Sequence, residues 1–188
     1  MSWKNDQVSE KETKRILGLA EEALKISGDY VEMGCYKGDT SLLLAELLVE
    51  KSVEKDVKKL WIYDSFDGLP EKREEDESAL GDLFKKGELF VTKREVKERF
   101  LRAGLPVPII KKAWFSDLKD EDLPSLIAFA FLDGDFYESI KDSLKLIVPR
   151  MNKDGIIVVH DYTNSALPGV KRAVDEVWVP DNIKMILM

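Results

Sequence analysis

Residues 125–140 read SLIAFAFLDGDFYESI, and this stretch decides the fold class. The part from 125 to 135 is expected to be a strand, and its apolar run shows no alternation, so both of its faces should be buried. Two aspartates, Asp133 and Asp135, stand at the end of this run, and a helical pattern follows from Tyr137. A doubly buried strand that leads directly into a helix is typical of a parallel α/β sheet.

Strand and helix patterns alternate along the rest of the chain. Residues 29–41 are expected to form a short strand that breaks into a glycine turn, and further strands are expected in 59–66, 107–115, 154–162 and 182–188. Helices are expected at 10–26, 41–50, 91–105, 137–151 and 168–178. Asp39 or Thr40 should cap the second helix, and Pro168 should open the last one. This order predicts an α/β fold with a Rossmann-like, doubly wound, mostly parallel sheet. We expect a single domain over 1–188, with a charged, irregular insert around 67–92.

Composition restricts the partners. The 188 residues carry 36 acidic and 29 basic side chains, a net charge of −7. An acidic chain is a poor partner for nucleic acid or an anionic membrane, so we expect neither. The lone cysteine, Cys35, cannot form an internal disulfide, and the N-terminus lacks the apolar region of a signal peptide. These features predict a cytoplasmic protein, and leave a homo-oligomer open.

Polar side chains gather where the expected strands end. Ligands of open α/β sheets bind outside the carboxyl ends of the strands, so these residues should share one edge. They are Glu32 and Gly34, Asp64 and Ser65, Trp114 and Phe115, Asp133 and Asp135, and His160 and Asp161.

The first turn, EMGCYKG at 32–38, argues against a dinucleotide. Its glycines are spaced G-x-x-x-G rather than G-x-G-x-x-G, and the carboxylate of Glu32 would repel a pyrophosphate. A ligand with positive charge suits the turn better, and S-adenosylmethionine carries a sulfonium, an ammonium and a ribose. Asp64, at the end of the second strand, can accept the ribose hydroxyls.

Several blocks of the chain resemble the macrocin O-methyltransferase group of class I S-adenosylmethionine-dependent methyltransferases. They are VEMGCYKGDTS, YDSFDGLP, AWFSDL, FLDGDFYESIKDSL and GIIVVHDYTNSALPGVKRAVDEV, from about residue 29 to about 177. The resemblance implies an S-adenosylmethionine-dependent methyltransferase. It would O-methylate a small hydroxylated, sugar-like acceptor with the help of a divalent metal. The sheet of such methyltransferases ends in an antiparallel hairpin. Because few residues follow the last helix, we expect this C-terminal hairpin to be shortened.

The resemblance also implies roles for single residues. Asp133 would be a magnesium ligand and Asp135 the general base, and Asp161 would complete the metal site. His160 replaces an aspartate of the family pattern, and imidazole suits zinc, iron, manganese or nickel better than magnesium. The expected cofactor-binding residues are Glu32, Gly34, Tyr36, Gly38, Thr40, Ser41, Asp64, Ser65, Trp114, Phe115 and Asp133.

Structural interpretations of the same residues stay open. Asp133 and Asp135 can cap the helix that starts near Phe136, and Asp64 can form an Asx turn. Backbone amides can satisfy Glu32, and His160 can be a plain hydrogen-bonding residue. Trp114 and Phe115 are more typical of core side chains than of residues that stack on adenine. Cys35 is typical of a small buried side chain, and the charged run 71–78 is typical of a solvated surface. The insert can be a lid or a surface loop.

Two other functions also stay open. One is an S-adenosylmethionine-binding protein with reduced catalysis. The other is a metal-dependent enzyme on the same sheet that does not use S-adenosylmethionine, with Asp133, His160 and Asp161 as its site.

Overall fold

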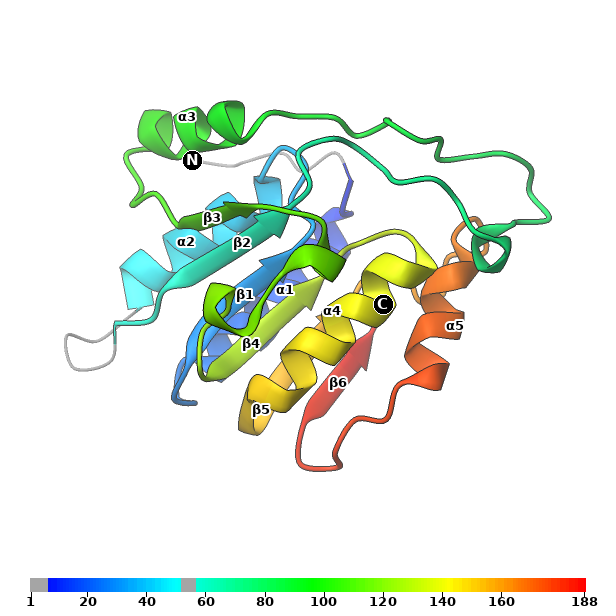
Figure 1. Cartoon of the computed structure of the whole chain (residues 1–188). Helices are drawn as coiled ribbons and strands as arrows, with labels where there is room; N and C mark the ends of the chain where they lie inside the picture. Colours follow the sequence, from blue (N-terminus) through cyan, green and yellow to red (C-terminus); the bar gives the residue numbers. More distant parts are fainter. Residues whose placement is uncertain (1–6, 52–56) are drawn as a thin grey trace.

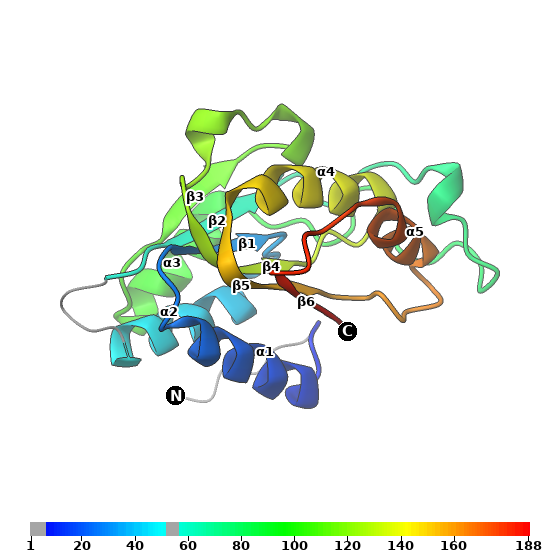
Figure 2. The same ribbon diagram turned by 90° about the horizontal axis from the view of Figure 1, so that it is seen from below.

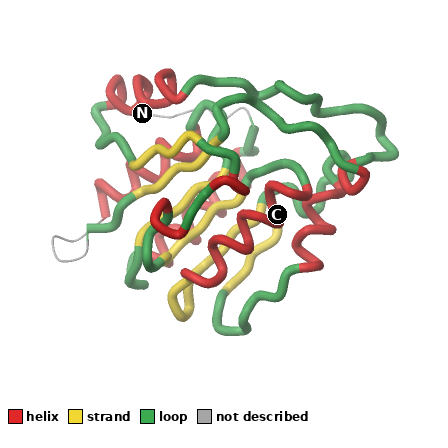
Figure 3. The backbone as a smooth tube through the Cα atoms, viewed as in Figure 1, coloured by secondary structure: helices red, strands yellow, loops and turns green. Residues whose placement is uncertain are grey.

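The computed structural model describes residues 7–51 and 57–188, and its centre is a six-stranded parallel sheet (Figures 1 and 3). The strands are β1 (Asp29–Met33), β2 (Leu60–Asp64), β3 (Ile109–Lys112), β4 (Ile127–Leu132), β5 (Met151–Val159) and β6 (Lys184–Leu187). Their order is β3-β2-β1-β4-β5-β6, and every neighbouring pair is parallel. The predicted Rossmann-like, doubly wound α/β fold is confirmed.

Helices cover both faces of the sheet (Figure 2). One layer holds α1 (Glu10–Ala23), α2 (Asp39–Lys51) and α3 (Lys93–Ala103), and the other holds α4 (Tyr137–Ile147) and α5 (Pro168–Glu176). Short 3₁₀ turns lie at Glu74–Asp76, Phe115–Asp117, Asp120–Asp122 and Val148–Arg150. No helix among the described residues is both long enough and apolar enough to cross a bilayer.

The core lies in two layers, one on each side of β4. All six residues of β4 are buried, as its unbroken apolar run predicted. Phe129 and Phe131 pack with the α1, α2 and α3 layer, while Ala130 and Leu132 pack with α4 and α5. The β4 strand is thus an interior strand that is covered on both faces. Asp133, which follows it, lies near the middle of the row formed by the carboxyl ends of the strands.

Several predicted boundaries are wrong by a few residues. The first helix ends at Ala23 rather than 26, and the third strand ends at Lys112, before Trp114. Asp39 is the first residue of α2 and not a cap that precedes it. Gly104 ends α3 in the left-handed conformation, as the glycine near its end predicted.

The last strand departs from the expected hairpin. The β6 strand pairs with β5 in parallel, with Val159 opposite Leu187. Because α5 crosses between the two strands, the chain returns in the same direction as β5, which is the usual result of a βαβ connection. The prediction of a shortened antiparallel C-terminal hairpin is therefore wrong for the residues that the structure describes. Residues 1–6, the first part of the N-terminus examined for a signal peptide, lie outside them.

Candidate functional site

A cavity of about 650 Å³ opens at the carboxyl ends of β1 to β5. It lies where the strand order reverses, between β1 and β4, and this is the usual ligand position in such sheets. The lining includes these predicted residues: Glu32, Gly34, Tyr36, Thr40, Asp64, Ser65, Trp114, Phe115, Asp133, Asp135, His160 and Asp161. Of the residues predicted to bind the cofactor, Gly38 and Ser41 are buried and do not line the cavity.

The loop between β1 and α2 approaches β4 closely. Gly34 has φ +89°, and a Cβ atom there would lie 2.0 Å from the carbonyl oxygen of Asp133. The Gly34 amide donates to the carbonyl of Tyr63, 2.8 Å away, so the loop is held against β2 as well. Only glycine fits this position, because it has no Cβ and tolerates a positive φ.

Asp64 ties β2 to this loop. Its Oδ2 accepts hydrogen bonds from the amides of Cys35 (2.9 Å) and Tyr36 (3.2 Å). Its Oδ1 accepts from the amide of Phe66, 2.7 Å away. The Asx-turn interpretation is thus confirmed, and the same carboxylate also faces the cavity.

Glu32 lies at the floor of the cavity and is 1% exposed. Its carboxylate accepts a hydrogen bond from the hydroxyl of Ser41, rather than the backbone amides of the alternative interpretation. Burial raises the pKa of Glu32 to about 8, and the nearby carboxylates of Asp133, Asp64 and Asp39 act in the same direction. The floor of the site therefore favours a proton or another positive charge.

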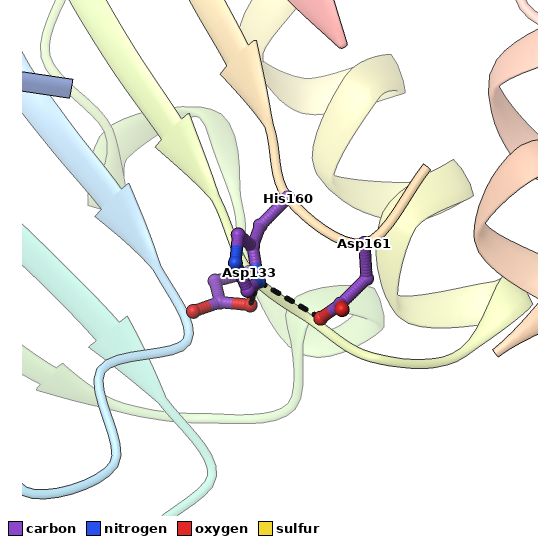
Figure 4. Close-up of side chains that lie close together, drawn as sticks. All are labelled: Asp133, His160 and Asp161. Atoms are coloured by element: carbon purple, nitrogen blue, oxygen red, sulfur yellow. Dashed lines mark hydrogen bonds and ion pairs between the residues drawn. The ribbon is translucent and has the colours of Figure 1, made fainter. Parts of the chain in front are cut away.

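His160 lies between two carboxylates (Figure 4). Its Nδ1 is 3.0 Å from Oδ1 of Asp133 and 2.8 Å from Oδ2 of Asp161. Burial lowers the pKa of His160, but the two carboxylates outweigh burial and raise this pKa to about 11. Glu12, on α1, adds a carboxylate oxygen 3.8 Å from Nε2. An imidazolium at this point would balance one of the two negative charges.

The same three side chains can hold a metal ion. Their ligand atoms all lie within 4.8 Å of one another, and no other such group is found in residues 7–51 and 57–188. Two ligands at right angles, each about 2.1 Å from an ion, are about 3 Å apart. Nδ1 of His160 lies at about this distance from a carboxylate oxygen of each aspartate. One nitrogen with two oxygens suits manganese, iron or zinc better than magnesium. The donors fit a divalent ion, but not magnesium in particular.

Asp135 lines the cavity beside this triad, in the left-handed conformation with φ +61°. Burial raises its pKa well above the usual range, and the charges of Asp133 and Asp161 add to this effect. The ionised form of a carboxyl group with a raised pKa is a stronger base than an ordinary carboxylate, which makes Asp135 a candidate general base.

Helix capping does not explain the two aspartates after β4. The first residue before α4 is Phe136, and it makes no side-chain cap. The amide of Tyr137 donates instead to Oδ1 of Asp76, 2.7 Å away, so the cap comes from the insert. The capping interpretation of Asp133 and Asp135 is therefore wrong, and both residues line the cavity.

Asp76 was missed by the sequence analysis, which assigned the whole run 71–78 to solvent. It is 2% exposed, and a Cβ atom on Gly169 of α5 would lie 2.0 Å from its Oδ1. Hydrogen bonds between Leu69 and the 87–88 segment close the base of the insert. The insert is thus anchored to α4 and α5, and Lys72 and Arg73 from it line the cavity.

The aromatic pair after β3 is only partly core. Trp114 is 38% exposed and lines the cavity, so the core interpretation is wrong for it. Phe115 is half-buried and packs against the layer of α4 and α5. Cys35 is buried, and burial raises the pKa of its thiol well above the usual range, in agreement with the structural interpretation.

Other cavity residues gave no signal in the sequence. Gln7 and Val8 precede α1 and line the cavity. Asn164 donates to Oδ1 of Asp161 over 2.8 Å and so orients a triad carboxylate. Glu12 does not line the cavity itself, and its approach to His160 could not be predicted because it depends on how α1 packs.

Comparison with known proteins identifies relatives. Residues 14–187 match the family model described as Macrocin-O-methyltransferase (TylF). One relative, an "8-demethyl-8-(2,3-dimethoxy-alpha-L-rhamnosyl)-tetracenomycin-C 4'-O-methyltransferase" from Streptomyces olivaceus, is 29% identical over 146 residues, covering 75% of this chain and 55% of the relative. Another, a "Demethyldecarbamoylnovobiocin O-methyltransferase" from Streptomyces niveus, is 30% identical over 158 residues, covering 80% and 58%. The chain therefore spans little more than half the length of these curated relatives.

Solved structures agree. The O-methyltransferase NovP superposes with a TM-score of 0.76 at 29% identity, over 88% of this chain and 70% of NovP. The calicheamicin methyltransferase CalS11 gives 0.75 at 20% identity, over 89% and 70%, which supports the fold alone. The resemblance read from the sequence blocks is confirmed, and the chain belongs to the macrocin-O-methyltransferase family.

Proposed function

We propose that the chain is an S-adenosylmethionine-dependent O-methyltransferase for a small hydroxylated, sugar-like acceptor. The observation that carries the proposal is the convergence of two groups on one cavity. The glycine loop and Asp64 lie on one side, and Asp133, Asp135, His160 and Asp161 lie on the other. The relatives named for tetracenomycin and novobiocin compounds support the O-methyl transfer.

The charge of the cavity suits the methyl donor. Ten Asp and Glu residues line it, against three Lys and Arg residues. A pyrophosphate would meet Glu32 and Asp64, whereas a sulfonium and an ammonium would be attracted. Gly34 lets the loop lie directly against the backbone at the end of β4, so that both segments line the same cavity. S-adenosylmethionine, when bound, supplies a methyl group on a positively charged sulfur.

The chain's own residues would then align the acceptor and move one proton. Alignment accounts for much of the rate in such a displacement. Asp135 would accept the proton of the acceptor hydroxyl, and its raised pKa makes it a stronger base than an ordinary carboxylate. Trp114 offers an exposed aromatic face in the same cavity for an acceptor ring.

A divalent ion would be held by Asp133, His160 and Asp161. A bound ion lowers the pKa of a hydroxyl in contact with it. Asn164 would keep Asp161 oriented toward the triad.

A second candidate is a protein that binds S-adenosylmethionine without turnover. The observation in its favour is that Nδ1 of His160 already contacts both carboxylates, which satisfies them without an ion. The two candidates differ in turnover and share cofactor binding.

Calorimetric titration with S-adenosylmethionine and with S-adenosylhomocysteine tests the shared part, without metal and with Mg²⁺ or Mn²⁺. We expect micromolar binding of both compounds, and absence of binding in all conditions would overturn both candidates. For turnover, Asp135→Asn should lower methyl transfer at least about a hundredfold, and leave the dissociation constant of S-adenosylhomocysteine within about threefold. A fully active Asp135→Asn variant would refute the base assignment.

A further inference from the structure

The loop between β1 and α2 has a conformation that needs support. Gly34, Tyr36 and Gly38 all have positive φ, of +89°, +44° and +77°. Tyr36 carries a Cβ atom, so this region is unfavourable for it. Such a conformation persists only where surrounding contacts hold it. Because most of this loop lines the cavity, the contacts that hold it also shape the proposed cofactor site.

The loop is held from two sides. On the cavity side, Asp64 accepts the amides of Cys35 and Tyr36. On the opposite side, Arg99 of α3 donates from Nη1 to the carbonyl of Lys37, 2.6 Å away. Its Nη2 donates to the carboxylate of Asp39. One planar guanidinium thus joins the two residues that flank Gly38.

The Arg99 contact is shielded. Asp39 is 6% exposed, and the side chain of Arg99 is largely covered. A Cβ atom on Gly38 would lie 3.2 Å from Cγ1 of Val96, so α3 packs directly on the turn. Charged hydrogen bonds with little exposure are stronger than those on an open surface. Arg99 also balances the charge of Asp39, which otherwise adds to the acidic floor around Glu32.

We infer that Arg99 is a positioning residue for the methyl-donor site. It does not line the cavity. It acts through the Lys37 carbonyl and Asp39 to fix the loop on which the donor rests. The inference rests on the proposed function, since it names the donor as the ligand of this loop.

The test uses the full chain and three variants. Arg99→Gln removes the positive charge and the planar guanidinium that donates to two acceptors. Arg99→Lys keeps the charge, but its ammonium can reach only one of the two acceptors, the Lys37 carbonyl or the Asp39 carboxylate, at a time. Arg102→Gln is the control, because Arg102 is exposed on the same helix and its Nε donates a hydrogen bond to the Glu98 carbonyl, one turn back in α3. Calorimetry measures S-adenosylhomocysteine binding. Hydrogen exchange measures deuterium uptake by residues 34–40, with α5 as the internal reference.

Arg99→Gln should weaken S-adenosylhomocysteine binding about tenfold, and Arg99→Lys should fall between it and the unchanged chain. Arg102→Gln should bind as the unchanged chain does. Uptake at 34–40 should rise in Arg99→Gln while uptake in α5 stays the same, which a general loss of stability would not produce.

Equal binding and equal uptake for Arg99→Gln and Arg102→Gln would overturn the inference. A rise in uptake across α5 as large as that at 34–40 would also overturn it. If the unchanged chain binds no S-adenosylhomocysteine, the proposed function fails, and the exchange measurement still decides whether Arg99 holds the loop.

Discussion

Glu32 should make the stability of the chain fall as the pH rises. The pKa of Glu32 is about 8 in the folded chain, against 4.5 for an ordinary glutamate, because burial disfavours the charged form. Folding then favours the protonated carboxyl group. Below pH 4.5 the Glu32 carboxyl group does not lower the free energy of unfolding, since it is protonated in both the folded and the unfolded chain. Between pH 4.5 and 8 the unfolded chain loses the proton and the folded chain keeps it, so stability is lost across that window.

The substitution Glu32→Gln measures how much the ionisable side chain of Glu32 changes the free energy of unfolding at each pH. Glutamine resembles the protonated acid and can still accept the hydrogen bond from Ser41. Relative to the unchanged chain, it should add less than about 1 kcal/mol to the free energy of unfolding at pH 5. The gain should be about 3 kcal/mol at pH 7, and about 5 kcal/mol at pH 9.

Urea unfolding at pH 5, 7 and 9 measures these differences. Glu50→Gln, on the exposed side of α2, is the matched control and should change the free energy of unfolding by less than about 0.5 kcal/mol at each pH. A Glu32→Gln variant that shifts stability by the same amount at pH 5 and pH 9 would refute the reasoning, because Glu32 would then have the same pKa in both states.

Two further predictions concern the anchor and the triad. Asp76→Ala leaves the Tyr137 amide without its partner, so urea unfolding should show a loss of about 1–2 kcal/mol. Glu74→Ala, on the exposed side of the same turn, should lose almost nothing, and equal losses would contradict the role of Asp76. His160→Asp converts the triad to oxygen donors, so Mg²⁺ should displace bound Mn²⁺ at least about tenfold more readily than in the unchanged chain. Electron paramagnetic resonance of free Mn²⁺ measures this, and an unchanged preference would exclude His160 as a ligand.

The edge of the sheet could be predicted because its signals are local. Each strand is an apolar run that ends in a polar residue, and parallel connections bring all the carboxyl ends to one edge. It can therefore be predicted, without knowledge of side-chain packing, that Asp64, Asp133 and His160 lie at the same cavity. Helix ends were less accurate, because the last turn of α1 and the first turn of α2 depend on tertiary contacts.

Asp76 and Arg99 could not be found in this way. Asp76 contacts Tyr137, 61 positions along the chain, and Arg99 contacts Asp39, 60 positions back. Both lie in segments rich in charge, where the usual expectation of an exposed side chain is correct for most neighbours. What distinguishes them is burial against another element, and neither spacing nor composition shows which charged residue will be buried.

Asp64 illustrates why opposed interpretations of a site residue need not exclude each other. Oδ1 closes the Asx turn at the Phe66 amide, while Oδ2 accepts hydrogen bonds from the Cys35 and Tyr36 amides of the glycine loop. The carboxylate has about four lone-pair sites. The three amides use two on Oδ2 and one on Oδ1, so Oδ1 can still accept one hydrogen bond from a ligand in the cavity. The hydrogen bonds that fix the side chain reduce its freedom before any ligand arrives, which lowers the entropy cost of binding. The structural role of Asp64 is thus a condition for the proposed functional one, and Arg99 supports the same loop from its other side.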